Sequence, residues 1–284
     1  MATDGSVHVW VGDSPPVAPA ALALLAPEEK ARAARLGEGP PGRAFVAARV
    51  LLRQALSWCR GVAAQDWRFE ADAHGRPWIV QPADAAALHF SLSHTAGCVV
   101  CAVSTQRVIG VDVEPADRAI ELRSVRRVLT PLEQAWVTAE PGCTRERLLR
   151  LWTLKEAYGK SVGLGLQAAL SSVGFVQDAP GGEGLQLHAP SGTVCGSARQ
   201  WRIHARFILA LVMGAPAGQT HWHGVDPLAL EPLQDGPPRP GEAESRGQVQ
   251  GTACSSSGHR RRLALDASGV SVRKPHGPQV FSCE

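Results

Sequence analysis

The 284-residue sequence lacks the features that mark membrane and secreted proteins. It contains no stretch of about 18 uninterrupted apolar residues, so we expect no membrane-spanning helix. Residues 1–10 lack both the basic patch and the apolar run of a signal peptide. The seven cysteines are an odd number and show no regular spacing, which argues against a disulfide framework. These absences predict a cytoplasmic protein in a reducing environment.

The sequence also lacks a strong excess of either charge. A formal net charge of +3 is too small to indicate nucleic-acid binding by itself, although it allows a local basic site for an anionic small molecule. Hydrophobic residues make up 44% of the chain, which is enough to bury a sizeable core. The length allows one large domain or two of ordinary size.

Apolar patterning predicts a similar order of elements twice along the chain. In the first part we expect a strand at 6–11, helices within 16–60 broken at Pro40 and Pro41, and strands at 67–69, 87–92 and 98–104. In the second part we expect a strand at 108–113, a helix starting at Thr130, a longer helix over 144–162, and strands at 173–176 and 208–213. The runs 98–104 and 108–113, separated by a few polar residues, predict a hairpin.

This order predicts an α+β protein with two similar halves, residues 1–106 and 107–215. Beyond residue 216, Pro, Gly, Ser and Gln dominate and periodic apolar positions become few. Residues 216–284 are therefore expected to form a mostly disordered tail.

The strand at 108–114 carries the first candidate site. Alternate side chains of a strand share a face, so Asp112 and Glu114 point the same way at the end of an apolar run. Two neighbouring carboxylates repel each other unless a positive charge lies between them. Gly110 would let a ligand approach the backbone. The alternative is a solvated pair at a strand end.

The helix at 144–162 carries the second candidate site. Lys155 falls within an apolar stripe, where a charge must be paired or bound to an ion. Glu156 and Lys160 lie one turn apart on the adjacent stripe, which is also the pattern of an ordinary surface pair.

Taken together, Asp112, Glu114 and Glu156 would supply three oxygen ligands of the kind that Mg²⁺ prefers. Lys155 and Lys160 would offer positive charge to phosphates bound by the same ion. Such a site favours phosphoryl transfer, in which positioning and charge neutralisation dominate.

These motifs carry a family resemblance. Gly110-Val111-Asp112-Val113-Glu114, followed by residues 152–160 (Trp-Thr-Leu-Lys-Glu-Ala-Tyr-Gly-Lys), resembles the paired signature of the 4′-phosphopantetheinyl transferases, in the larger surfactin-synthetase-activating type. Three further segments resemble the same family: Gly75-Arg76-Pro77, Phe90-Ser91-Leu92-Ser93-His94 and Thr130-Pro131-Leu132-Glu133. The resemblance covers roughly residues 6–215.

The resemblance implies two pseudo-symmetric α+β halves in a monomer, with coenzyme A at their interface. The implied reaction moves phosphopantetheine from coenzyme A to a serine of an apo acyl or peptidyl carrier protein, a holo-[acyl-carrier-protein] synthase activity. Mg²⁺, or alternatively Mn²⁺, is the implied metal. A catalytically degenerate homologue that only binds coenzyme A or the carrier is the alternative.

The resemblance also assigns roles to residues. Asp112, Glu114 and Glu156 would bind the metal together with the coenzyme diphosphate. Glu156 would also act as base toward the carrier serine, and Lys160 would contact the transferred phosphate. The implied coenzyme-binding set comprises basic, hydroxyl and acidic side chains: Lys30, Arg32, Arg43, Arg76, Ser93, His94, Asp112, Lys155 and Lys160.

Three other motifs could indicate a different function. Cys98 and Cys101 are three positions apart on an apolar strand, which favours core packing over a redox pair. His221 and His223 could contact a metal, but no partner ligands stand near them in the sequence. The tail arginines 260–262 would support nucleic-acid binding as a rival function, although such runs are more often simply solvated.

Overall fold

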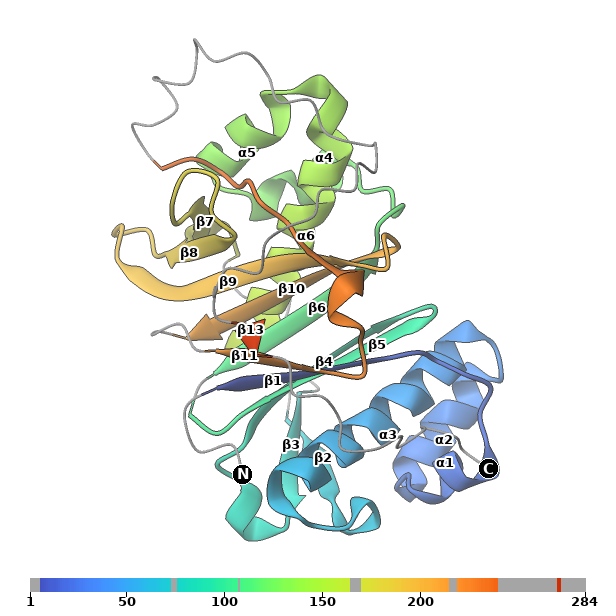
Figure 1. Cartoon of the computed structure of the whole chain (residues 1–284). Helices are drawn as coiled ribbons and strands as arrows, with labels where there is room; N and C mark the ends of the chain where they lie inside the picture. The colour runs from blue at the N-terminus through green and yellow to red at the C-terminus, as the bar shows by residue number, and fades with distance from the viewer. Residues whose placement is uncertain are drawn as a thin grey trace.

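A computed structural model of the chain describes residues 6–72, 76–106, 108–163, 170–214 and 219–239, together with the backbone of 270–271. Two sheets lie side by side at the centre, with helices α1–α3 beyond one sheet and α4–α6 beyond the other (Figure 1). This arrangement agrees with the predicted α+β class and with two helix-plus-sheet halves.

The N-terminal half supplies three helices and most of one sheet. Its elements are β1 (Val7–Gly12), α1 (Pro19–Ala23), α2 (Pro27–Leu36), α3 (Pro40–Arg60), β2 (Arg68–Ala71), β3 (Pro77–Gln81), β4 (His89–Thr95) and β5 (Cys98–Ser104). Helix α3 begins at the predicted break, because proline suits the first helical turn. It ends before Gly61, whose φ of 72° is a left-handed conformation that glycine adopts without strain.

The C-terminal half supplies the second sheet and its covering helices. Its elements are β6 (Ile109–Pro115), α4 (Leu122–Val125), α5 (Pro131–Thr138), α6 (Thr144–Val162), β7 (Gly174–Gln177), β8 (Gly184–His188), β9 (Val194–Ile203) and β10 (Phe207–Gly214). Helix α5 has the predicted capping box: Glu133 N donates to Thr130 Oγ1, and Thr130 N donates to Glu133 Oε2. Helix α6 spans the predicted range and ends at Gly163.

The expected hairpin between residues 98–104 and 108–113 is wrong. Strand β5 pairs with β1 and β4, whereas β6 pairs with β10 in the other sheet. Two serine hydroxyls of β4 join the sheets: Val111 N donates to Ser91 Oγ at 3.0 Å, and Val113 N to Ser93 Oγ at 3.2 Å. Side chains thus satisfy edge amides of β6 that a hairpin partner would otherwise bond.

The predicted tail boundary is also wrong, because residues 219–239 are folded onto both halves. Strand β11 (Thr220–His223) pairs in parallel with β1, and β12 (Leu230–Pro232) pairs with β9. Trp222 is 2% exposed and packs in the core. These strands are too short for local periodicity to reveal, and their pairing is long-range. Strand β13 (Val270–Ser271) pairs with β11, and residues 240–269 and 272–284 lie outside the described residues.

One apolar core crosses the boundary between the halves. It includes Val9 of β1, Val100 of β5, Val111 of β6 and Leu209 of β10, each at most 1% exposed. The two halves therefore bury their sheets against each other, which fixes β4 beside β6. Within the described residues, no helix is both long and apolar enough to cross a bilayer.

Two cysteines follow the expectation. Cys98 and Cys101 are buried and free, which confirms core packing, and Cys59 and Cys195 are also free.

Candidate functional site

Strand β6 and helix α6 bring the predicted acidic residues to one place. A Cβ on Gly110 would lie 1.9 Å from Ala157 O and 2.7 Å from Ser161 N, so only glycine allows the helix to pack this closely on the strand. The sequence predicts that a ligand approaches the backbone at Gly110, but the structure shows helix α6 packed there instead. This contact sets Glu156 and Lys160 beside the end of β6.

Asp112 lies at the centre of the site and is 5% exposed. Its Oδ1 accepts hydrogen bonds from Ser93 Oγ at 2.8 Å and Lys160 Nζ at 2.7 Å. Its Oδ2 is buried without a hydrogen-bond partner among the residues that the structure describes. A buried carboxylate oxygen without a partner is costly, so this atom is placed to receive a ligand.

Glu114 and Glu156 complete the acidic group. Burial raises the pKa of Glu114, a hydrogen bond from Arg118 opposes the rise, and Asp112 adds to it. Burial and then the charge of Asp112 raise the pKa of Glu156, while Lys160 opposes the rise and Glu114 adds to it. The carboxylates thus act electrostatically on one another, which places all three in one site. Glu156 makes no hydrogen bond or ion pair with any other described residue.

The donor set fits a divalent cation in its chemistry. Three carboxylates and the unpartnered Asp112 Oδ2 offer the hard oxygen ligands that such ions take. In the described part of the chain, however, no three acidic, histidine or cysteine side chains are arranged to hold a metal ion. Asp112 is instead paired with Lys160, and Glu114 with Arg118. Two side-chain cations thus offset the charge of Asp112 and Glu114, and Glu156 is left without an ion pair among the described residues.

The assignment of Lys155 to the coenzyme phosphates is a wrong expectation. Its side chain is 0% exposed, and Nζ forms a salt bridge of 2.8 Å with Glu133 Oε2. The ammonium also donates to Leu170 O at 2.9 Å and to Val173 O. Glu133, equally buried, further accepts from Phe175 N. Glu133 in the core, rather than a phosphate, balances the charge of Lys155 on the apolar stripe. The spacing of residues in the sequence could not reveal this partner.

A basic region adjoins the acidic face. Partial desolvation, followed by the charges of Lys160, Arg49 and Arg32, lowers the pKa of His94. His94 is therefore within electrostatic range of Lys160, Arg49 and Arg32. Arg32 and Arg49 line a cavity of about 430 Å³, and both guanidinium groups lie 5.1 Å from the ring centroid of Phe45.

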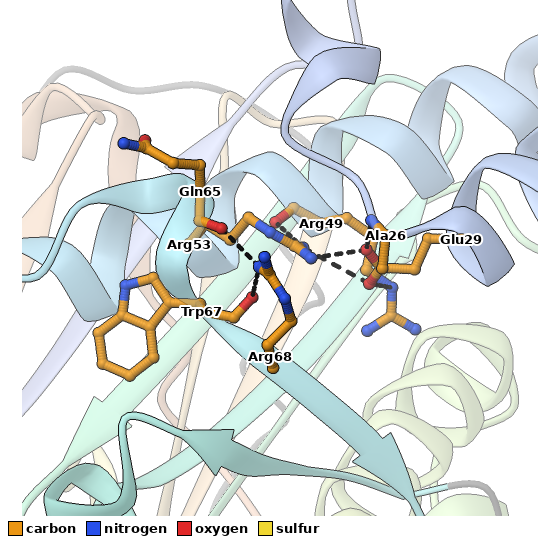
Figure 2. A network of polar contacts seen from close by, with 7 residues as sticks. All are labelled: Ala26, Glu29, Arg49, Arg53, Gln65, Trp67 and Arg68. Atoms are coloured by element: carbon orange, nitrogen blue, oxygen red, sulfur yellow. Dashed lines mark hydrogen bonds and ion pairs between the residues drawn. The ribbon is translucent and has the colours of Figure 1, made fainter.

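Sequence reasoning missed Arg49. Its position is fixed by Glu29 of α2, whose carboxylate pairs with Arg53 Nη2 at 2.7 Å and with Arg49 Nε at 3.5 Å (Figure 2). Ala26 N donates to the same carboxylate, so one acidic side chain joins the start of α2 to α3. Arg49 and Arg53 are one turn apart on the stripe that begins at Phe45, and this pattern could have identified a basic face.

The remaining coenzyme candidates are not brought together. Arg43 lies on another face of α3 and lines a separate cavity of about 560 Å³ with Asp13 and Trp10, so it does not join Arg32 and Arg49. Lys30 is exposed on α2, outside the described lining of the smaller cavity. Arg76 lies against the end of α6, since a Cβ on Gly163 would meet its Nη1 at 2.6 Å. Gly75 lies outside the described residues.

Comparison with known proteins gives a consistent family match in both halves. Residues 14–106 match the family described as "4′-phosphopantetheinyl transferase, N-terminal", and residues 108–212 match the "4′-phosphopantetheinyl transferase superfamily". The 4′-phosphopantetheinyl transferase HetI of Nostoc sp. is 33% identical over 146 residues, which is 51% of this chain and 62% of that protein. The transferase Sfp of Bacillus subtilis is 28% identical over 152 residues, 53% of this chain and 66% of its own length.

The matched region therefore spans less than two thirds of these relatives. Among solved structures, the holo-[acyl-carrier-protein] synthase of Thermotoga maritima aligns over 40% of this chain and 66% of its own. Its TM-score of 0.31 and identity of 22% are too low to carry an argument.

Proposed function

This chain belongs to the 4′-phosphopantetheinyl transferase superfamily, and from that premise we propose that it transfers the phosphopantetheine arm of coenzyme A to a serine of an apo acyl or peptidyl carrier protein. Matches in both halves support this function. The observation that carries it is that Asp112, Glu114 and Glu156 act electrostatically on one another beside Lys160. A separate cavity is lined by four arginines and three glutamates.

The charges of the two regions are complementary to coenzyme A, which has a diphosphate and a separate 3′-phosphate. We assign the 3′-phosphate to Arg32, Arg49 and His94, because arginine forks bind phosphate well and both arginines act electrostatically on His94. Phe45 and Phe69 line the same cavity and offer apolar surface to the adenosine part. Lys30, Arg76 and Ser93 are further proposed contacts of the coenzyme. The positions of Arg43 and Lys155 do not support a contact with the coenzyme.

Asp112, Glu114 and Glu156 would hold the metal, for which Mg²⁺ is proposed and Mn²⁺ is a substitute. When bound, such an ion supplies charge that offsets the negative charge of the coenzyme diphosphate. The fit rests on the unpartnered Oδ2 of Asp112 and on the oxygen chemistry of the three side chains.

Two side chains of α6 would take part in the transfer step itself. The carrier serine Oγ forms a bond to the phosphorus next to pantetheine, and the bond from that phosphorus to the bridging oxygen breaks, which releases adenosine 3′,5′-bisphosphate. Glu156 accepts the serine proton as general base. Lys160, 29% exposed, places its ammonium beside the transferred phosphate.

The finer assignment includes the carrier and the setting. Acyl carrier proteins are proposed substrates, which would make the activity that of a holo-[acyl-carrier-protein] synthase, and peptidyl carriers are the second class. We propose that the protein acts as a monomer in the cytoplasm and needs neither nucleic acid nor membrane. No observation favours the degenerate alternative, since the chain has all three acidic residues and Lys160 of the family motif.

The direct test is to incubate the protein with coenzyme A, Mg²⁺ and several apo carrier types, and to measure the mass of each carrier. We expect a gain equal to one phosphopantetheine arm, lost when a chelator removes the metal. A carrier that stays apo in every combination would reject the function. A protein shortened after residue 239 separates this function from nucleic-acid binding through the tail, because only transfer should survive the deletion.

A further inference from the structure

Arg118 occupies the acidic face although no sequence motif pointed to it. It follows β6 in a turn in which its N donates to Pro115 O at 3.0 Å. The guanidinium forms an ion pair with Glu114 and lies 5.9 Å from the ring centroid of Trp152 on α6. The side chain therefore reaches from the end of the strand toward the helix that carries Glu156.

Arg118 acts on more than one of the carboxylates. Its charge opposes the raised pKa of Glu156 as well as that of Glu114. Glu156 lies one helical turn after Trp152, on the same side of α6. Arg118 thus pairs with Glu114 and lies near the turn of α6 that precedes Glu156.

The two cations of the site differ in how firmly they are held. The side chain of Arg118 is 43% exposed and that of Glu114 is 12% exposed. For the other pair, the side chain of Lys160 is 29% exposed and that of Asp112 is 7% exposed. Exposed ion pairs are weak, because water and salt screen them. Arg118 can move into solvent, whereas the mostly buried Glu114 then needs another cation in its place.

We propose that Arg118 is a competing cation, which holds Glu114 in the metal-free protein and must release it before Glu114 can join Asp112 and Glu156 around a divalent ion. The absence of a ready three-ligand arrangement in the described residues agrees with this exchange. The inference rests on the proposed function in one respect, the assignment of these carboxylates as metal ligands. Arg118 thereby sets the metal concentration that the enzyme needs.

The test measures metal binding directly, without coenzyme or carrier. Mn²⁺ is titrated into the full chain and free Mn²⁺ is followed by electron paramagnetic resonance. Arg118→Gln should bind Mn²⁺ roughly fivefold more tightly than wild type, because a weak competing pair has been removed. Arg118→Lys should behave like wild type. The matched control is Arg123→Gln, which removes an exposed arginine paired with Glu121 and should change nothing.

A second background identifies the partner. In Glu114→Gln protein, Arg118→Gln should no longer tighten Mn²⁺ binding, because the competing pair is already gone. Unchanged or weaker Mn²⁺ binding by Arg118→Gln in the wild-type background would overturn the proposal. So would absence of Mn²⁺ binding in every variant. The carrier mass assay reports on the transferase function separately, so transfer with no effect of Arg118 on metal binding would reject this inference alone.

Discussion

Two lysines on helix α6 face similar carboxylates in different surroundings. Lys155 and Glu133 are both 0% exposed, and backbone groups satisfy both side chains further. Lys160 is partly exposed, and one oxygen of the buried Asp112 has no partner among the described residues. The comparison teaches that a closed, satisfied pair holds the helix, whereas an open pair with an unmet bonding group is placed to bind a ligand.

The largest expected effect breaks the closed pair. Lys155→Met should lower the free energy of unfolding by about 3–5 kcal/mol, because Glu133 is left charged and buried. Chemical denaturation measures the loss. Lys155→Met combined with Glu133→Leu should recover part of it, since two apolar groups replace both charges, although Phe175 N loses its acceptor. Unchanged stability in the single variant would contradict the structural role.

The next effect concerns the open pair. Lys160→Met should reduce the transfer rate about 100-fold, as expected when a charge beside the transferred phosphate is lost. Its free energy of unfolding should fall by less than in Lys155→Met, because the side chain of Lys160 is 29% exposed whereas that of Lys155 is fully buried. The carrier mass assay and denaturation measure the two quantities on one sample. The role fails if stability falls and transfer does not. Lys160→Arg retains the charge and should keep part of the activity.

The smallest effect is a pH dependence from His94. Its pKa lies below the ordinary value of 6.5, so the imidazole is neutral at pH 7 and becomes charged only as pH falls through that lowered value. Coenzyme binding should therefore tighten by roughly two- to fivefold on acidification in this range, because the cation attracts phosphate. His94→Gln should lose this gain. The coenzyme phosphate also titrates near pH 6, but equally for both proteins. Parallel pH profiles would exclude His94 from the phosphate site.

Local signals predicted the helices well. The Thr130 capping box and the glycine after Val162 fixed α5 and α6, because caps depend on neighbouring residues. Strands β11 and β12 could not be predicted, since each is short and depends on a partner far along the chain. Strand β6 pairs with β10 rather than with β5 for the same reason.

The candidate site shows the same limit. Spacing placed Asp112, Glu114 and Glu156, because one strand face and one helix face decide where they point. It failed for Lys155, whose partner Glu133 comes from α5, and it missed Arg49 and Arg118. These outcomes depend on which elements pack against each other, which the sequence pattern does not contain.

The most direct measurement compares Glu156→Gln with wild type in the carrier mass assay. Gln keeps the shape of the side chain but removes the carboxylate proposed as base and metal ligand. The account predicts transfer at least about 100-fold slower with normal folding. The control, Glu146→Gln, changes a residue of the same helix that pairs with Arg202 of β9, and it should transfer normally. Transfer by Glu156→Gln at the wild-type rate would contradict the account.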